Sequence, residues 1–82
     1  MALFIGVHDN GAPMPDEEMQ AGWKAYKAAC ANHGCEPIRA HVNAGKGKAF
    51  CLTEASSSDE VQAAHDEAKV PLVDVIEVKI LE

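Results

Sequence analysis

The sequence predicts an α+β fold with the element order β-α-β-β-α-β, and this prediction depends on three observations. Short apolar runs rich in β-forming residues lie near both ends of the chain, at residues 3–8 and 73–80. Two longer segments, one starting near Pro15 and one near Ser57, place apolar residues at helical spacing. Between them, residues 37–43 alternate as a strand does, and residues 48–54 return as its partner after the turn sequence AGKG.

The first helix is predicted to begin at Pro15 and to end before Gly34. Proline is favoured in the first turn of a helix, where its missing N–H is not needed, and glycine is favoured just beyond the last turn. Three acidic residues follow the proline and suit the positive end of the helix dipole. One face of this helix carries apolar residues at the spacing i, i+4, i+7 and i+11, namely Met19, Trp23, Tyr26 and Cys30.

The second half of the chain supplies the hairpin, a second helix and the last strand. Ser57 and Glu60 fit a capping box at the start of the second helix, and Pro71 lies beyond its end. The inward stripe of that helix is predicted to contain Val61, Ala64, His65 and Ala68. In the first hairpin strand, Ile38, Ala40 and Val42 alternate with Arg39, His41 and Asn43.

Right-handed crossover connections leave one compact arrangement for this element order. It is a ferredoxin-like fold, in which a four-stranded antiparallel sheet carries two helices on one face. The 82 residues are expected to form a single domain, 1–82, and so short a chain buries only a little over ~60% of its unfolded surface. A second copy would enlarge the core, so we expect a homodimer of the dimeric α/β-barrel type.

Charge and cysteine content narrow the classes of function. Thirteen acidic residues against seven basic ones give a net charge of −6, which argues against nucleic acid and anionic membranes as partners. The N-terminal segment lacks the features of a signal peptide, and no apolar run approaches the length of a membrane span. The three cysteines are odd in number and form no CxxC pair. We therefore expect reduced thiols and a cytoplasmic protein.

The predicted topology brings three histidines towards one edge of the molecule. The first strand ends there at His8, the hairpin turns there near His41, and the second helix ends there near His65. Cys51 lies partway along the second hairpin strand. As a nucleophile, Cys51 would need a helix N-terminus or a cationic neighbour, and Lys48 lies on the opposite strand face. We therefore interpret Cys51 as a core residue or as a soft metal ligand beside imidazoles.

The remaining thiols have simpler interpretations. Cys30 lies on the apolar stripe of the first helix and is expected to be a small buried hydrophobe. Cys35 follows Gly34 and is expected to lie in a solvated loop, where His33 is its only ligand-like neighbour. A pair of ligands spaced H-x-C falls short of the three or more that a metal site needs.

Which sheet face each strand side presents is left open by the sequence. If the aliphatic set Leu3, Ile5 and Val7 faces the helices, the uncovered face carries His8, His41 and Glu77, and Cys51 can lie there with them. If the first strand is turned over, His8 and Cys51 point towards His65 instead. Period-two alternation is compatible with both arrangements.

The chain resembles a family of small bacterial and archaeal domains labelled nickel-binding, through the motifs FIGVH, GKAFCLTEA, VQAAH and DVIEV. Residues that recur in that family match His8, Cys51 with Leu52 and Glu54, and His65. The resemblance implies a ferredoxin-like fold, a dimer and the binding of Ni²⁺ or a similar divalent ion, without enzymatic activity. The chain departs from the family pattern at the helix-start residues Met14 and Ser56 and in its additional histidines, His33 and His41.

The leading functional hypothesis is a cytoplasmic protein that binds a divalent transition metal of the nickel type, in sequestration or buffering, through His8, Cys51, His65 and His41. One alternative is a small-molecule-binding protein or isomerase-type enzyme. Its pocket would lie at the dimer interface, lined by Phe4, His8, His41, Cys51 and Glu77. The other is a structural or regulatory homodimer without a ligand.

Overall fold

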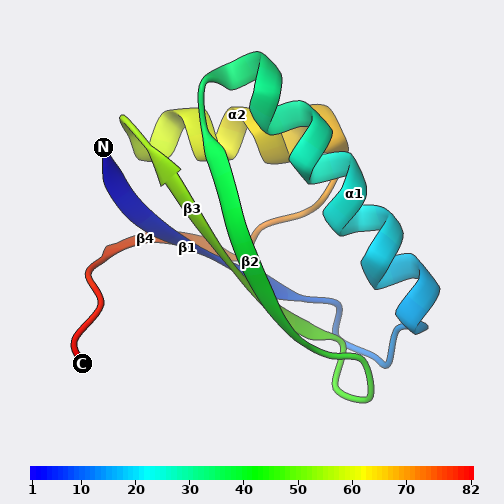
Figure 1. Cartoon of the computed structure of the whole chain (residues 1–82). Helices are drawn as coiled ribbons and strands as arrows, with labels where there is room; N and C mark the ends of the chain where they lie inside the picture. The colour runs from blue at the N-terminus through cyan, green and yellow to red at the C-terminus, as the bar shows by residue number, and fades with distance from the viewer.

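The computed structural model describes residues 1–82, and its helices and strands follow the predicted order (Figure 1). The chain turns sharply at Gly47, where φ is +64° and an added Cβ would collide with the carbonyl oxygen of Ala12. Six elements make up the fold: β1 (Ala2–Asp9), α1 (Asp16–His33), β2 (Glu36–Asn43), β3 (Lys48–Ala55), α2 (Ser58–Ala68) and β4 (Asp74–Val78).

The four strands form one sheet in the order β2-β3-β1-β4, and every neighbouring pair is antiparallel. Both helices cover the same face of this sheet (Figure 1). The predicted ferredoxin-like fold is thereby confirmed. Neither helix combines the length and the apolar composition that crossing a membrane requires.

Both helices end in the same backbone arrangement, although only one of them ends at a glycine. Gly34 and Lys69 each adopt a left-handed conformation, with φ of 71° and 59°. The next N–H then bonds back five residues, from Cys35 to the Cys30 carbonyl at 3.2 Å and from Val70 to the His65 carbonyl at 3.0 Å. This is the Schellman motif, which satisfies carbonyl groups left free at a helix end.

The start of α2 agrees with the prediction in position but not in its hydrogen bonds. Ser57 is the residue before the helix and has the extended backbone of an N-cap, yet its side chain makes no capping bond. The Glu60 carboxylate instead accepts a hydrogen bond from the Ser56 N–H at 2.7 Å. Only the glutamate half of the predicted capping box is formed, and it is displaced by one residue.

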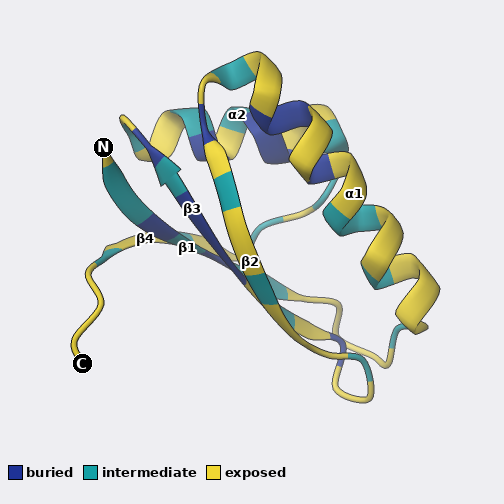
Figure 2. Cartoon of the chain, in the orientation of Figure 1, coloured by how far each residue is buried: buried dark blue, intermediate teal, exposed yellow.

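The core lies between the sheet and the helices (Figure 2). Phe4 and Gly6 of β1 are buried on this side, and His8 continues the same alternation. The structure thus resolves the question of strand faces: the first strand turns its Phe4 set, rather than its aliphatic set, towards the helices. Apart from Gly6, the buried residues of this core are Phe4, Tyr26, Ala29, Cys30, Cys35, Cys51, Ala55, Val61 and Ala64.

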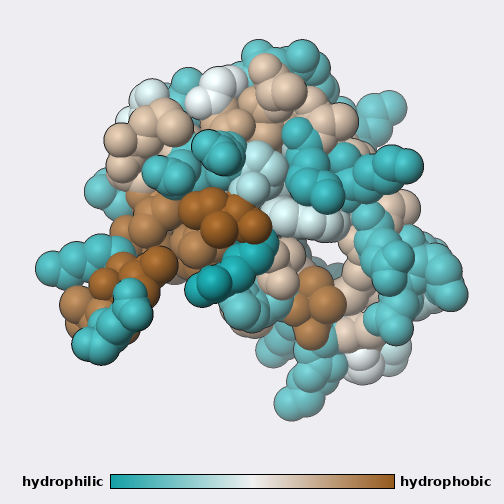
Figure 3. Space-filling view, in the orientation of Figure 1, coloured by the Kyte–Doolittle hydropathy of each residue, from teal (hydrophilic) through white to brown (hydrophobic).

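The other side of the sheet, called here the open face, is uncovered and apolar. Strand register places Ile5 between Leu52 of β3 and Ile76 of β4. Phe50 and Ile76 are 42% and 46% exposed. Figure 3 shows hydrophobic side chains gathered over the region of β1 and β4 and along the C-terminal segment. One of the two faces of the sheet is therefore left without a covering layer in the single chain.

Candidate metal centre

Three potential metal ligands from three different elements meet beneath the helices. His8 lies near the end of β1, Cys51 lies in the middle of β3, and His65 lies in the last turn of α2. Their ligand atoms all lie within 4.8 Å of one another. We call this group the His–Cys–His cluster. The convergence of His8 and His65 that the chain directions predicted is what the structure shows.

The distances within the cluster suit a single bound ion. Cys51 Sγ lies 3.5 Å from Nε2 of His8 and 3.5 Å from Nε2 of His65. Ligands that coordinate one ion tetrahedrally with bonds of roughly 2.0–2.3 Å lie roughly 3.3–3.8 Å apart. The two sulfur–nitrogen separations fall in that range, and the two Nε2 atoms lie within 4.8 Å of each other.

Backbone carbonyls orient both imidazole rings. His65 Nδ1 lies 2.8 Å from the carbonyl oxygen of Val61, and His8 Nδ1 lies 2.8 Å from that of Pro71. Since a carbonyl only accepts hydrogen bonds, each Nδ1 carries the proton in the neutral ring, and each Nε2 presents a lone pair to Cys51. Metal-binding histidines commonly have this outer hydrogen bond to a carbonyl.

The aromatic ring of Tyr26 supports His65 from the side of α1. The two rings stack with centroids 4.0 Å apart, and the Tyr26 hydroxyl shares a 2.5 Å hydrogen bond with that of Thr53. His65 is 1% exposed. Its position is therefore fixed by a hydrogen bond, a stacked ring and close packing together.

Burial keeps the cluster electrically neutral. Desolvation lowers the pKa of His65 to about 4, and the same cause lowers the pKa of His8. Desolvation also raises the pKa of the Cys51 thiol. Near pH 7 the cluster therefore consists of two neutral imidazoles and one protonated thiol. The Cys51 thiol has one proton, which can form a hydrogen bond with the Nε2 lone pair of His8 or of His65 but not with both. A cation in place of this proton would be bound by Sγ and by both Nε2 atoms.

Gly6 makes room for the cluster and was not identified from the sequence. It lies opposite Cys51 in the β1–β3 register. A Cβ at Gly6 would lie 2.7 Å from Cys51 Sγ and 3.3 Å from His65 Cε1. A glycine inside an otherwise apolar strand is the signal that points to such a close approach.

Two residues considered from the sequence lie outside the cluster. His41 is exposed and pairs with Phe50, on the open face, whereas its neighbour Ala40 pairs with Cys51. Glu54 pairs with Leu3 near the far end of β3 and also belongs to the open face. Adjacent strand residues point to opposite sides of a sheet, so closeness along the edge does not bring His41 to His65.

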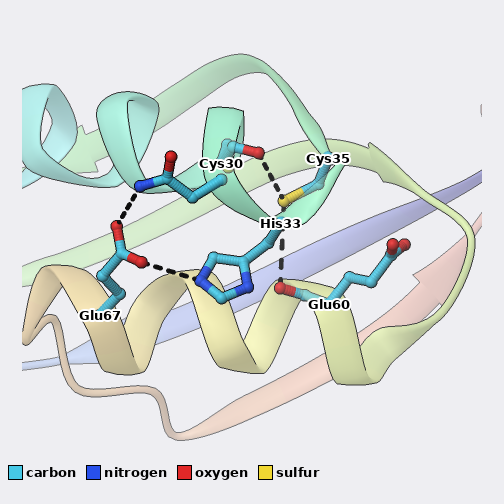
Figure 4. A network of polar contacts seen from close by, with 6 residues as sticks. Cys30, His33, Cys35, Glu60 and Glu67 are labelled. Atoms are coloured by element: carbon cyan, nitrogen blue, oxygen red, sulfur yellow. Dashed lines mark hydrogen bonds and ion pairs between the residues drawn. The ribbon is translucent and has the colours of Figure 1, made fainter.

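His33 and Cys35 lie together at the end of α1 (Figure 4). His33 Nε2 lies 3.0 Å from a carboxylate oxygen of Glu67, which ties α1 to α2. The expectation that Cys35 is solvated was wrong, because it is only 8% exposed. Its thiol lies 3.8 Å from the Cys30 carbonyl oxygen and 3.9 Å from that of Glu60. As the residue after the left-handed Gly34, Cys35 folds back onto the last turn of α1 and packs there.

The pocket expected between two open faces is not formed by the residues named for it. Phe4 and Cys51 are 4% and 3% exposed beneath the helices, on the opposite side of the sheet from His41. A pocket of about 270 Å³ instead lies on the helix side, where the cluster forms part of its wall. Figure 3 shows a hollow in this region, between β2 and α1.

The chain is thus a small ferredoxin-like domain whose His–Cys–His cluster could hold a metal ion. The family described as "Nickel responsive protein SCO4226-like" matches residues 4–78, and the chain belongs to this family. The resemblance drawn from the sequence motifs is thereby confirmed.

Comparison with solved structures supports the fold. The crystal structure of SCO4226 from Streptomyces coelicolor A3(2) matches with a TM-score of 0.90, covering 99% of this chain and 100% of that one. Sequence identity is 22%, so this likeness concerns the fold alone. The search among curated proteins gave no match.

Proposed function

We propose that this protein binds a divalent transition metal of the nickel type through His8, Cys51 and His65, and acts in sequestration or buffering. The observation that carries the proposal is the convergence of two imidazole lone pairs on one thiol, at 3.5 Å each. The family description, nickel responsive, agrees with this chemistry. Imidazole and thiolate together suit Ni²⁺, Cu²⁺ and Zn²⁺.

The donor set does not by itself favour nickel. In the Irving–Williams order Cu²⁺ binds more tightly than Ni²⁺ to a given set of nitrogen and sulfur ligands. Occupation by nickel would therefore depend on which metals the cell makes available. All three cysteines are free thiols, which agrees with the reducing cytoplasm that we propose as the location.

We further propose that two copies associate through their open faces. Phe50 and Ile76 are each more than 40% exposed, and the half-buried Ile5 lies beside Ile76 on the same face. A second sheet would cover these side chains in the way that the helices cover the other face. The His–Cys–His cluster lies on the helix side, so each copy would carry its own metal site.

Calorimetric titration with Ni²⁺ tests the metal site. Loss of a ligand should weaken binding by at least about 100-fold, since even outer hydrogen-bonding partners contribute 10–100-fold. The chain offers matched controls: His8→Ala and His65→Ala remove cluster histidines, whereas His33→Ala and His41→Ala remove histidines outside it. Cys51→Ala is paired with Cys35→Ala in the same way. The proposal would be overturned if the control variants weakened Ni²⁺ binding as much as the cluster variants do, or if the unaltered protein bound no Ni²⁺ at micromolar concentration.

Proton release gives an independent check on the ligand set. Because the histidines are neutral and the thiol is protonated at pH 7, binding should release about one proton per ion. Titration in buffers of different ionisation enthalpy measures this number. Release that persists unchanged in Cys51→Ala would contradict thiolate coordination.

A further inference from the structure

The pocket beside the His–Cys–His cluster is lined by apolar side chains that have no role in metal binding. It lies between α1, the end of the β2–β3 hairpin and the segment after α2. Met14, Met19 and Trp23 line it from the α1 side, and Val42 and Val70 line it from the others. These side chains make an apolar chamber of about 270 Å³ that opens onto His8, Cys51 and His65.

The cluster supplies one ligand fewer than a closed site requires. A structural site uses four protein ligands, whereas a site with three protein ligands keeps a position for an exogenous one. All three residues of the cluster belong to the lining of the pocket, so the chamber is the side from which a further ligand would approach an ion there.

The chamber selects the chemistry of that further ligand. An apolar cavity of about 150 Å³ is enough to hold benzene, so this one has room for an aromatic ring joined to a donor group. Trp23, which is only partly buried, offers aromatic surface to such a ring. Asp9, Glu18 and Lys69 in the lining, together with a bound Ni²⁺ and the Cys51 thiolate, sum to a formal charge of zero, so the loaded pocket has no excess positive charge to attract an anion.

We propose that the metal-loaded protein binds a neutral aromatic nitrogen base, of the imidazole or pyridine type, with its nitrogen on the metal and its apolar body in this pocket. This inference rests on the proposed metal site. It turns a simple metal buffer into a protein that recognises a metal together with an organic ligand.

The test uses 4-phenylimidazole as the probe on protein loaded with Ni²⁺. Binding is followed in the visible absorption of the bound nickel and in the fluorescence of Trp23, which report on the metal and on the pocket respectively. Imidazole has the same donor without the apolar body, and 1-phenylpyrrole has a similar body without the donor. Burial of the phenyl ring should make 4-phenylimidazole bind at least about tenfold more tightly than imidazole. The phenylpyrrole should leave the nickel absorption unchanged.

Gly22 allows the pocket to be filled without touching the cluster. It lies in α1 and lines the pocket, and an added Cβ there meets only Val70 Cγ2, at 3.9 Å. Both leucine and alanine are better helix formers than glycine, so neither change should harm the fold. In Gly22→Leu, 4-phenylimidazole should bind at least about tenfold more weakly while Ni²⁺ affinity is kept; Gly22→Ala is the small matched control.

The outcomes separate this inference from the metal site itself. Failure to bind Ni²⁺ overturns both. Normal Ni²⁺ binding with equal affinities for 4-phenylimidazole and imidazole overturns the inference alone, as does release of nickel by the probe. The same holds if Gly22→Leu binds the probe as tightly as Gly22→Ala does.

Discussion

At the scale of single residues, the cluster depends on the small space between two chain segments. Cys51 Sγ sits directly above Gly6, and a methyl group on Gly6 would lie 2.7 Å from it. Contacts that short do not persist, so either the thiol or the backbone has to move. The geometry that suits an ion therefore depends on a residue with no functional group of its own.

Gly6→Ala should displace Cys51 and weaken Ni²⁺ binding by at least about tenfold, comparable to losing an outer partner of a metal ligand. It should also lower the free energy of unfolding by roughly 1–3 kcal/mol, the usual cost of overpacking a core. Nickel titration and urea unfolding measure the two effects. Gly45→Ala is the control, because its Cβ would lie 3.5 Å from Asn43 Oδ1, an ordinary contact.

His65 makes the stability of the metal-free protein depend on pH. Its pKa is about 4 in the folded chain and 6.5 ordinarily, so the unfolded chain binds the proton more readily between these values. Its contribution is present above pH 6.5 and is lost as the pH falls towards 4, by up to roughly 3 kcal/mol. Urea unfolding across this range in the presence of a chelator should show the loss. His65→Gln should reduce the dependence of the unfolding free energy on pH.

Part of the candidate metal site could be predicted from the sequence, and part of it could not. Chain direction alone brought His8 and His65 to one edge, because strand and helix ends are set by local signals. The sequence could not show which side of β1 faces the helices, because both sides of this strand are apolar and period-two alternation is compatible with either orientation. The sequence analysis also grouped His41 with His8 and His65, because all three lie near the same edge of the sheet. Position along an edge does not determine which face of the sheet a strand residue occupies.

At the scale of elements, the end of α2 fixes the backbone beside His65. The N–H of Val70 bonds to the His65 carbonyl, and this bond requires Lys69 to be left-handed. The end of α1 uses Gly34 at the equivalent position, and its motif was predictable from the glycine. The end of α2 was not, since a lysine gives no such signal.

Lys69→Gly should stabilise the protein by about 1 kcal/mol, because a left-handed conformation costs an L-residue roughly 1–2 kcal/mol and costs glycine little. Lys69→Ala is the matched control, since it removes the same charged chain but keeps the Cβ. A stabilisation shared equally by both variants would mean that the charge or length of the lysine, rather than its backbone, is responsible. Urea unfolding of the metal-free proteins measures the difference.

At the scale of the whole molecule, the sheet separates the two proposed functions. The helix side holds the His–Cys–His cluster and its pocket, and the open face holds the apolar surface proposed to join two copies. An 82-residue chain has little interior to spare, so leaving one sheet face uncovered is a substantial loss of burial. The fold was predictable from the order of the elements. Which face carries the cluster and which carries the apolar surface could be determined only from the strand register in the structure.

Phe50→Glu should convert the proposed dimer into a monomer, because it places a charge on the apolar open face. Sedimentation velocity measures the change, and Ala28→Glu, which adds the same charge to an exposed position of α1, should leave the dimer intact. Since the cluster lies across the sheet from Phe50, the monomeric variant should bind one Ni²⁺ per chain with affinity within about threefold of the unaltered protein. Loss of nickel binding on dissociation would show that the second copy completes the metal site, and would contradict the separation of the two faces.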